Sequence, residues 1–493
     1  MENSFILSLD QGTTSSRAII YNHKGEVCAM AQKEYPQIFP RPNWVEHNPS
    51  EILSSQFSVA TEVITKFGIS PENIVAAGIT NQRETTIVWD RKSGKPVYNA
   101  IVWQDHRTSD YCNQLIADGL SEMVKEKTGL EIDSYFSATK IKWILENVSG
   151  AKQKADNGDL LFGTVDTWLI YNLTGGKIHV TDVTNASRTM LFNISSLNWD
   201  DDLLKLFGIP KSMLPEVKMN DEIFANTAGK VLNTQIPIAA VTGDQQAAMF
   251  GQMCIEKGMA KNTYGTGCFM MVNTGEEFVR SKHKMLGTIA WNLGGKTTYA
   301  LEGSVFVGGA VIQWLRDGLE LIKKTSDVEA LALKSKDNGG VYFVPAFTGL
   351  GAPYWKQDAK GLIYGISRGT TQSQIARAAL ESIAFQSYDV LSAMEKDIGE
   401  KINKLRVDGG ASANNTLMQF QSDILNTEVQ RPEILETTSL GVAYMAGLNV
   451  GFWEDIEEVK NYWQLSKQFS PGIEPTKRNT LLSDWKNAVK RSF

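Results

Sequence analysis

The chain repeats one construction three times: a short apolar run that stops at a glycine-rich polar turn. These turns occupy residues 9–14, 263–267 and 407–415. An apolar run that ends in Gly, Asp or Pro is typical of a buried strand in an α/β protein, where polar side chains collect at the strand end. Because the first two turns lie in different halves of the chain, we expect two halves of similar construction.

The patterns around these turns alternate between strands and helices. The first residues predict a meander of strands, and a helix beginning at Pro49-Ser50-Glu51 follows. The predicted strands lie at 5–9, 17–21, 26–32, 74–79, 236–242, 268–272, 341–344 and 404–407. Strands that alternate with helical stretches favour a large α/β protein.

The length of the chain indicates more than one domain. Its 493 residues correspond to about three domains of ~150 residues, or to two large ones. No Pro/Ser-rich stretch separates the halves, so we expect a packed hinge at 251–258 rather than a flexible tether. The predicted domains are residues 1–250 and 251–493.

The charge distribution excludes several classes of partner. The net charge is −6 and no block of consecutive Lys or Arg occurs, which argues against a nucleic-acid-binding protein. The first residues lack the basic region of a signal peptide, and no stretch reaches the ~18 apolar residues that span a bilayer. We therefore expect a cytoplasmic protein that is not membrane-integral and has no nucleic-acid partner.

The cysteines and histidines give no sign of a metal centre. Four Cys and five His are scattered along the chain, without a C-x-x-C pair or an H-E-x-x-H motif. We expect buried, reduced thiols and a catalytic chemistry that relies on carboxylates.

The first turn combines one carboxylate, one glycine and two hydroxyls. Gly12 allows a ligand to approach the backbone closely, and Thr13 and Thr14 can donate to phosphate oxygens. Asp10 can hold Mg²⁺ through the waters that this ion retains. These residues suit a nucleotide phosphate with its magnesium, although a hairpin turn with satisfied hydroxyls requires the same residue types.

The two later turns offer similar loops at strand ends. The turn at 407–415 can place glycine backbone against an adenine or a ribose. A plain strand-to-helix turn, with Asn414 as the cap of a helix at 417–425, explains the same residues. Both interpretations stay open at this point.

Other polar residues also follow predicted strands. Asp244 follows the apolar run 238–241 and is our candidate general base, although it can equally cap the helix that begins at Gln245. Arg83 and Glu84 offer donors and acceptors to a polyhydroxy ligand, but the pair alone favours a solvated ion pair.

Three aromatic residues complete the set of candidates. Trp103, Tyr135 and Phe269 suit an apolar wall for the carbon chain of a small polyol. Any single one of them is more often part of the core than of a ligand site.

Two longer strings resemble a known family. Residues 135–147 resemble the first signature of the FGGY family of carbohydrate kinases, and residues 441–448 resemble the second. The resemblance covers nearly the whole chain. It implies an α/β fold of two ribonuclease H-like domains with a cleft between them, as in the superfamily of actin, sugar kinases and chaperone ATPases.

Five further strings resemble the branch of that family that phosphorylates glycerol. They lie at 79–85, 100–104, 163–168, 185–190 and 264–269. The resemblance implies an enzyme that transfers a phosphoryl group from ATP to glycerol, giving sn-glycerol 3-phosphate and ADP as the first step of glycerol utilisation. It also implies Mg²⁺ with ATP and no other cofactor, and a homodimer or homotetramer.

The resemblance further implies roles for individual residues. Residues 1–250 would carry the glycerol site and the first phosphate loop, with Asp10 beside the magnesium ion as a second catalytic residue, and residues 251–493 would carry the ATP and adenosine site. Glycerol contacts are implied for Arg83, Glu84, Trp103, Tyr135, Asp244, Gln245 and Phe269, with Asp244 as the catalytic base. Nucleotide contacts are implied for Thr13, Thr14, Ser15, Arg17, Gly265, Thr266, Gly309, Gln313, Gly409, Gly410, Ala411 and Asn414.

Alternatives to this function remain. A kinase for another polyol or ketose, such as erythritol, xylulose or dihydroxyacetone, would use the same scaffold. A non-enzymatic ATP switch of the chaperone or filament type would share the fold. Residues 471–479 resemble a region where some relatives dock a regulatory protein, and they also suit a solvated surface turn.

Overall fold

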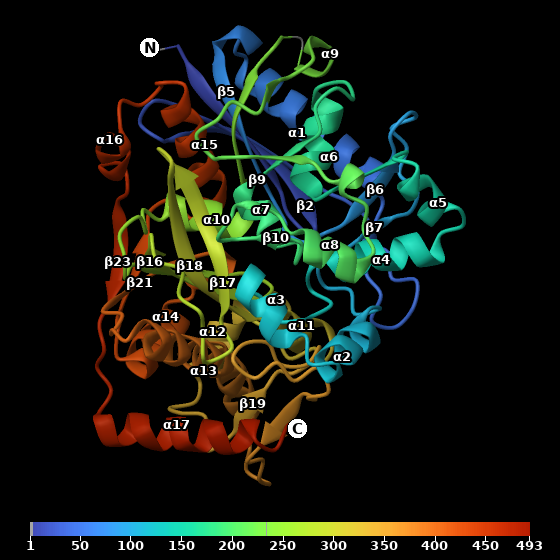
Figure 1. The fold of residues 1–493 in the computed structure, drawn as a ribbon. Coiled ribbons are helices and arrows are strands. Elements are labelled where there is room, and N and C mark those ends of the chain that lie inside the picture. The colour runs from blue at the N-terminus through green and yellow to red at the C-terminus, as the bar shows by residue number, and fades with distance from the viewer. Residues whose placement is uncertain (1–2, 233) are drawn as a thin grey trace.

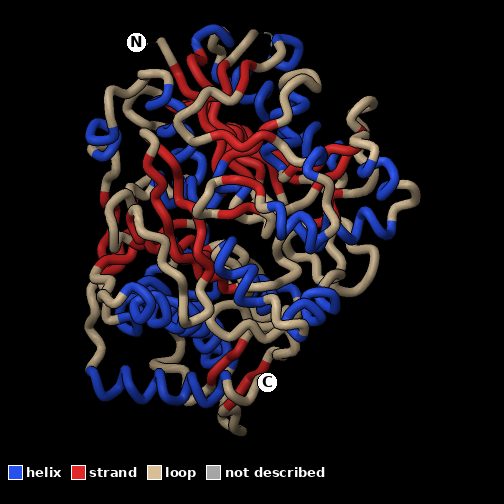
Figure 2. The backbone as a smooth tube through the Cα atoms, in the orientation of Figure 1, coloured by secondary structure: helices blue, strands red, loops and turns tan. Residues whose placement is uncertain are grey.

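Two large β-sheets organise the molecule, one from each half of the chain (Figure 1). The computed structural model describes residues 3–232 and 234–493. Figure 2 shows the strands of both sheets with helices around them. Within the described residues, no helix combines the length and apolar character needed to cross a membrane.

The amino-terminal sheet has the strand order β13-β14-β5-β1-β2-β3. Strands β1, β2 and β3 form an antiparallel meander, β5 adds parallel to β1, and β14 adds parallel to β5. Strands β1 and β5 are buried almost throughout, because they are apolar and have neighbours on both sides. The strands are β1 Phe5–Gln11, β2 Ser15–Tyr21, β3 Val27–Glu34, β5 Ile74–Asn81, β13 Ala225–Asn226 and β14 Pro237–Gly243.

The carboxy-terminal sheet repeats this topology. Its order is β17-β18-β16-β15-β21-β22-β23, and the five strands β18-β16-β15-β21-β22 pair in the same directions as β3-β2-β1-β5-β14. The strands are β15 Ala260–Tyr264, β16 Cys268–Gly275, β17 Leu286–Leu293, β18 Lys296–Val305, β21 Lys404–Asp408, β22 Glu428–Pro432 and β23 Leu465–Phe469. The prediction of an α/β fold with two similar halves is confirmed.

Two helices connect the halves. Helix α10 (Asp244–Gly251) follows β14, and α15 (Thr437–Asn449) comes from the carboxy-terminal half but packs on α10 and on the amino-terminal sheet. A Cβ on Gly441 of α15 would lie 1.9 Å from the carbonyl oxygen of Ala247 in α10. Only glycine fits this contact, which explains the glycine that begins the string at 441–448.

Most of the predicted elements are present. The predicted helix is α1 (Pro49–Phe67), whose N-cap Asn48 accepts a hydrogen bond from the Ser50 amide. The run 341–344 forms β19 (Tyr342–Val344), which pairs with β20 (Leu362–Tyr364) in a two-stranded sheet outside the two large ones. The cysteines are free thiols, and three of them are buried as predicted, whereas Cys28 is partly exposed.

The other described helices and strands surround this framework. The helices are α2 Ser109–Ala117, α3 Ser121–Thr128, α4 Ser137–Asn147, α5 Ala151–Asp156, α6 Val165–Leu173, α7 Val183–Ala186, α8 Asp201–Phe207, α9 Gly229–Leu232, α11 Ala310–Asp317, α12 Asp327–Ala332, α13 Gln372–Ile398, α14 Asn415–Leu425, α16 Ile456–Lys460 and α17 Pro475–Val489. The strands are β4 Glu46–His47, β6 Ile87–Asp90, β7 Ala100–Ile101, β8 Leu160–Gly163, β9 Val180–Asp182, β10 Phe192–Asn193, β11 Asn198–Trp199 and β12 Glu216–Lys218.

Candidate active site

Two cavities meet where the strand-end loops of the two halves face each other. The small cavity has a volume of about 210 Å³ and is lined by the loops that follow β1, β5 and β14. The large cavity has a volume of about 410 Å³ and lies in the carboxy-terminal half, beside the short helix Gly410–Ala413 and α14. Thr266, in the turn between β15 and β16, lines both cavities. A ligand in the large cavity can therefore extend past Thr266 into the small one.

The cavities bring together most of the predicted site residues. The small cavity collects all seven side chains predicted to contact glycerol, together with Thr13 and Thr14. The large cavity is lined by the predicted nucleotide residues Gly265, Thr266, Gly309, Gln313, Gly410, Ala411 and Asn414. Among the described residues that line these two cavities, Asp10, Ser15, Arg17 and Gly409 do not appear.

Three of those four residues make other contacts within the protein. Ser15 is buried in β2, where its Oγ accepts a side-chain hydrogen bond from β3 at 3.0 Å. The Arg17 guanidinium pairs with the Glu436 carboxylate. Gly409 has a φ of +82°, and a Cβ there would lie 2.6 Å from the carbonyl oxygen of Tyr264. Gly409 thus lets the end of β21 pass close to β15, and its contact with a nucleotide stays a prediction.

The structure of the first turn is compatible with both interpretations of its sequence. Residues 12–14 form the turn of the β1–β2 hairpin, in which the Gly12 amide donates to the Ser15 carbonyl at 3.0 Å. Trp103 Nε1 donates to Thr13 Oγ1 at 2.9 Å, which leaves the hydroxyl proton of Thr13 available to a ligand. The loop is a hairpin turn that also lines the small cavity.

Asn414 and Asp244 both lie at the start of a helix, but only Asn414 is an N-cap. The side chain of Asn414 caps α14 by accepting from the amide three residues later at 2.8 Å, and Asn414 also lines the large cavity. Asp244 is the first helical residue of α10 and not its N-cap, so the capping alternative is wrong. Its Oδ1 accepts from the Gln245 amide at 2.7 Å and lies 3.1 Å from Arg83 Nε. These contacts hold the Asp244 carboxylate at the wall of the small cavity.

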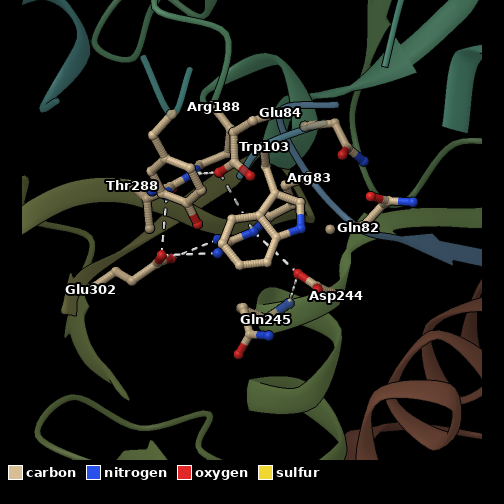
Figure 3. Close-up of polar contacts among 12 residues, drawn as sticks. Gln82, Arg83, Glu84, Trp103, Arg188, Asp244, Gln245, Thr288 and Glu302 are labelled. Atoms are coloured by element: carbon tan, nitrogen blue, oxygen red, sulfur yellow. Dashed lines mark hydrogen bonds and ion pairs between the residues drawn. The ribbon is translucent and has the colours of Figure 1, made fainter. Parts of the chain in front are cut away.

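Four buried charges meet beside Asp244 (Figure 3). Arg83 donates to both carboxylate oxygens of Glu302, at 2.5 and 2.8 Å, and Arg188 lies 2.7 Å from Glu84 and 3.1 Å from Glu302. At most 2% of each side chain is exposed. The prediction of a solvated ion pair at Arg83 and Glu84 is therefore wrong, because β18 from the other half covers the end of β5 and supplies Glu302.

The pKa values in this cluster follow from burial and charge. Burial alone would raise the pKa of Glu302, but the charges of Arg188 and Arg83 outweigh it and lower the pKa to about 2. Burial outweighs the same two arginines at Glu84 and raises its pKa. Burial also raises the pKa of Asp244, against the opposing charge of Arg83. Asp244 is therefore more basic than an ordinary aspartate, which favours a role as proton acceptor.

Both halves of the chain match the same family of proteins. Residues 5–251 match the N-terminal domain of the FGGY family of carbohydrate kinases, and residues 260–450 match the C-terminal domain. The chain belongs to the FGGY family of carbohydrate kinases. The resemblance seen in the two signature strings is confirmed.

Relatives within the FGGY family align over almost the entire chain. The glycerol kinase of Burkholderia pseudomallei is 58% identical over 490 residues, which cover 99% of this chain and 98% of that protein. Glycerol kinase 2 of Thermotoga maritima is 59% identical over 489 residues, 99% of each chain. The crystal structure of Plasmodium falciparum glycerol kinase with ADP has a TM-score of 0.91 and 39% identity, and covers 99% of this chain and 98% of that one. A xylulose kinase from Lactobacillus acidophilus has a TM-score of 0.88 at 22% identity, covers 99% of this chain and 97% of that one, and shares the fold.

The FGGY site contains charged residues to which the sequence assigned no role. Besides Glu302 and Arg188, the fully buried Lys261 of β15 donates to Gln245 Oε1 and, at 2.9 Å, to Thr263 Oγ1. Burial outweighs the neighbouring carboxylates and lowers the pKa of Lys261 to about 8. Only Glu302 offered a signal, because it follows the apolar stretch Tyr299-Ala300-Leu301 within β18 and a buried charge requires a partner.

Asp10 is a suitable place for a magnesium ion in an FGGY kinase. Among the described residues its carboxylate has no hydrogen-bond partner, although Arg17 lies opposite it in the β1–β2 register. Burial raises its pKa to about 6, with Glu436 and Asp244 adding to the rise and Arg17 opposing it. The described residues contain no cluster of three metal-ligating side chains, but Mg²⁺ usually takes one or two carboxylates and completes its shell with phosphate and water. Asp10 fits an ion that arrives with a nucleotide.

An Asp10→Asn variant is expected to be more stable than the parent but to bind Mg-nucleotide more weakly. The folded pKa of about 6 lies above the ordinary value of 3.8, so ionised Asp10 opposes folding at neutral pH. Removing that charge should stabilise the nucleotide-free protein by about 1–3 kcal/mol near pH 7. Urea unfolding near pH 7 and near pH 4 checks this, because the difference should shrink as Asp10 of the parent protonates. A variant less stable than the parent at pH 7 would contradict the electrostatic account.

Proposed function

We propose that this chain is an ATP-dependent glycerol kinase that transfers the γ-phosphoryl group of ATP to glycerol and releases sn-glycerol 3-phosphate and ADP. The observation that carries the proposal is the junction of the two cavities at Thr266, with Asp244 on the wall of the small one. The glycerol kinases of Burkholderia pseudomallei and Thermotoga maritima, which align over nearly the full length, support glycerol as the acceptor.

The small cavity suits a polyol because it has one aromatic and one polar wall. The ring centroid of Trp103 lies 5.9 Å from that of Phe269 and 5.7 Å from that of Tyr135. Arg83 and Glu84 lie among the polar residues that line the same cavity. Glycerol presents C–H groups along its carbon chain and hydroxyls at its edge, which match these two kinds of wall. We assign the glycerol contacts to these five residues, Asp244 and Gln245.

Asp244 is the group proposed to accept the proton of the attacking hydroxyl. Its contacts with Arg83 Nε and the Gln245 amide orient the carboxylate, and burial raises its pKa. Phosphoryl transfer requires little covalent work from the protein, and a base that orients the nucleophile in line with the phosphorus contributes mainly through positioning. A carboxylate held on the cavity wall meets this requirement.

The nucleotide is assigned to the large cavity and the loops beside it. A volume of about 410 Å³ is sufficient for a nucleoside, and the phosphates would pass Thr266 toward the hydroxyls of Thr13 and Thr14. When bound, Mg²⁺ held by Asp10 and the phosphates would neutralise the negative charge of the transferred group. Closure of the two halves around both substrates would exclude water, the competing phosphoryl acceptor.

The family resemblance also supports the assembly and the compartment. We include in the proposal a cytoplasmic homodimer or homotetramer without a nucleic-acid partner. Residues 471–474 are mostly exposed, whereas residues 475–479 form the start of α17 and not a turn; a docking site for a regulatory protein at 471–479 stays a prediction.

The proposal is tested by measuring ADP release from Mg-ATP with different acceptors. Glycerol should support turnover at least about tenfold faster than dihydroxyacetone, erythritol, xylulose or no acceptor. A preference for another acceptor would keep the Asp244 chemistry and reassign the small cavity. ATP hydrolysis that is slow and independent of any acceptor would contradict the kinase and favour an ATP switch.

A further inference from the structure

The turn between β1 and β2 is held by four side chains that contact its carbonyls. Tyr35 Oη lies 2.5 Å from the carbonyl oxygen of Gly12 and 2.7 Å from that of Thr13. Gln11 Nε2 and Gln82 Nε2 also donate to the Gly12 carbonyl, at 2.8 and 3.1 Å, and Gln37 Nε2 donates to the Thr13 carbonyl at 3.1 Å. Both carbonyls are therefore satisfied on the side of the turn where Tyr35 lies.

The same turn leaves two of its amides unused. The Gly12 amide donates to the Ser15 carbonyl at 3.0 Å, and the Thr14 carbonyl accepts from the Tyr35 amide at 3.3 Å. Within the part of the chain that the structure describes, no protein acceptor lies in hydrogen-bond reach of the Thr13 and Thr14 amides, and both residues line the small cavity. A turn with engaged carbonyls and free amides beside a cavity is suited to bind an anion.

We propose that Tyr35 is a positioning residue for phosphate binding, whose hydroxyl orients the Gly12 and Thr13 peptides so that the free amides of the turn serve the nucleotide phosphates. The inference deepens the proposed function and rests on it. Tyr35 is only 6% exposed, so it acts through the turn and does not touch the nucleotide.

The reason lies in the freedom of the glycine peptide. Glycine has no Cβ to restrict its backbone, so the Gly12 peptide could rotate and present its carbonyl oxygen to a phosphate, which that oxygen would repel. Tyr35 opposes this rotation. Gln11 and Gln82 amides donate to its Oη at 2.8 and 3.1 Å, which directs the single hydroxyl proton toward the two carbonyls. Donors that are oriented in advance need no rearrangement when the charged ligand arrives.

The network also reaches the aromatic wall of the small cavity. Thr85 Oγ1 donates to Gln82 Oε1 at 2.9 Å and accepts from the Trp103 amide at 3.3 Å. Trp103 Nε1 in turn donates to Thr13 Oγ1 at 2.9 Å. A displaced turn is therefore expected to slow phosphoryl transfer as well as to weaken phosphate binding.

A Tyr35→Phe variant tests the inference. It removes the hydroxyl and keeps the ring, whose centroid lies 5.1 Å from that of His47. Calorimetry should show about tenfold weaker binding of Mg-bound β,γ-imido-ATP, the loss expected for one hydrogen bond of about 1.4 kcal/mol, and adenosine affinity within about twofold of the parent. The kcat/KM for Mg-ATP should fall by at least this factor, because a slower transfer step adds to the weaker binding, while KM for glycerol changes less than about twofold.

Two further variants complete the test. Tyr444→Phe is the matched control, because its buried hydroxyl has no partner among the described residues, and it should bind the analogue as the parent does. Gln37→Leu removes the second donor to the Thr13 carbonyl, at a partly exposed position. It should weaken binding of the ATP analogue about threefold. This variant keeps the inference testable if Tyr35→Phe does not fold.

The outcomes separate the inference from the proposed function. The positioning role would be overturned if both Tyr35→Phe and Gln37→Leu bound the ATP analogue as tightly as the parent does. It would also be overturned if these variants lost as much affinity for adenosine as for the analogue. A parent that shows no glycerol-dependent turnover, together with a selective loss of analogue binding in Tyr35→Phe, would overturn the proposed function and leave the positioning role standing.

Discussion

An Asp244→Asn enzyme is expected to bind glycerol nearly normally and to transfer almost no phosphate. Asparagine has the shape of aspartate and keeps an oxygen for Arg83 Nε, 3.1 Å from Oδ1, and for the Gln245 amide at 2.7 Å. It cannot accept the proton of the attacking hydroxyl. A general base contributes about 10²–10⁴-fold to the rate, so kcat should fall within this range while KM for glycerol changes less than about threefold.

Steady-state ADP release and calorimetric titration with glycerol measure the two effects separately. Asp201→Asn is a suitable control, because Asp201 is 79% exposed and pairs with Lys211 at the surface, and it should keep the kcat of the parent. Turnover of Asp244→Asn near that of the parent would remove Asp244 as the base. A loss of glycerol binding in parallel with kcat would instead make Asp244 a binding residue.

Replacing Glu302 by glutamine is expected to destabilise the protein by about 3–5 kcal/mol. The change removes the negative charge that balances the positive charges of Arg83 and Arg188. At most 2% of any side chain in this cluster is exposed. The low pKa of Glu302, about 2, means that this stabilisation is fully present above its ordinary value of 4.5 and is lost as the pH falls toward 2. Glycerol affinity should fall as well, because Arg83 loses the partner that holds its guanidinium.

Chemical denaturation of the ligand-free protein at neutral pH measures this loss. Glu277→Gln provides the control, because Glu277 is 78% exposed and lies 3.9 Å from Lys257, where a surface pair contributes about 0–1 kcal/mol. If Glu302→Gln were no more destabilising than this control, the buried cluster would not be a stabilising contact between the two halves.

Much of the fold could be predicted from local sequence. Strands such as Phe5–Gln11 and Ile74–Asn81 are short apolar runs that end in polar turns, and their ends carry Asp10 and Arg83 as expected. The seven predicted glycerol contacts come together in one cavity, although assigning a role to each of them depended on the family resemblance. Hydrophobic patterning acts over neighbouring residues, which is why such elements are visible in a single sequence.

The interpretation from sequence failed where a residue's environment comes from distant parts of the chain. Arg83 and Glu84 look like a solvated pair because the segment around them gives no sign that β18 will cover them. Gly409 has a φ of +82° and packs against the backbone of Tyr264. The sequence of its own turn does not predict this contact, because Tyr264 belongs to a distant strand. Asp244 could be taken for a helix cap until the start of α10 was seen.

Local sequence was therefore enough to define the strands, the glycine turns and the residue types at the strand ends. Long-range packing set the charge partners of the site, since Arg83 and Glu302 are 219 residues apart in the chain yet 2.5 Å apart in space. It also set which way the first turn presents its peptides, because Tyr35, which follows β3, and Gln82, which follows β5, contact its carbonyls. Burial and electrostatics depend on what lies across a contact, and that becomes known only when both halves of the chain are folded together.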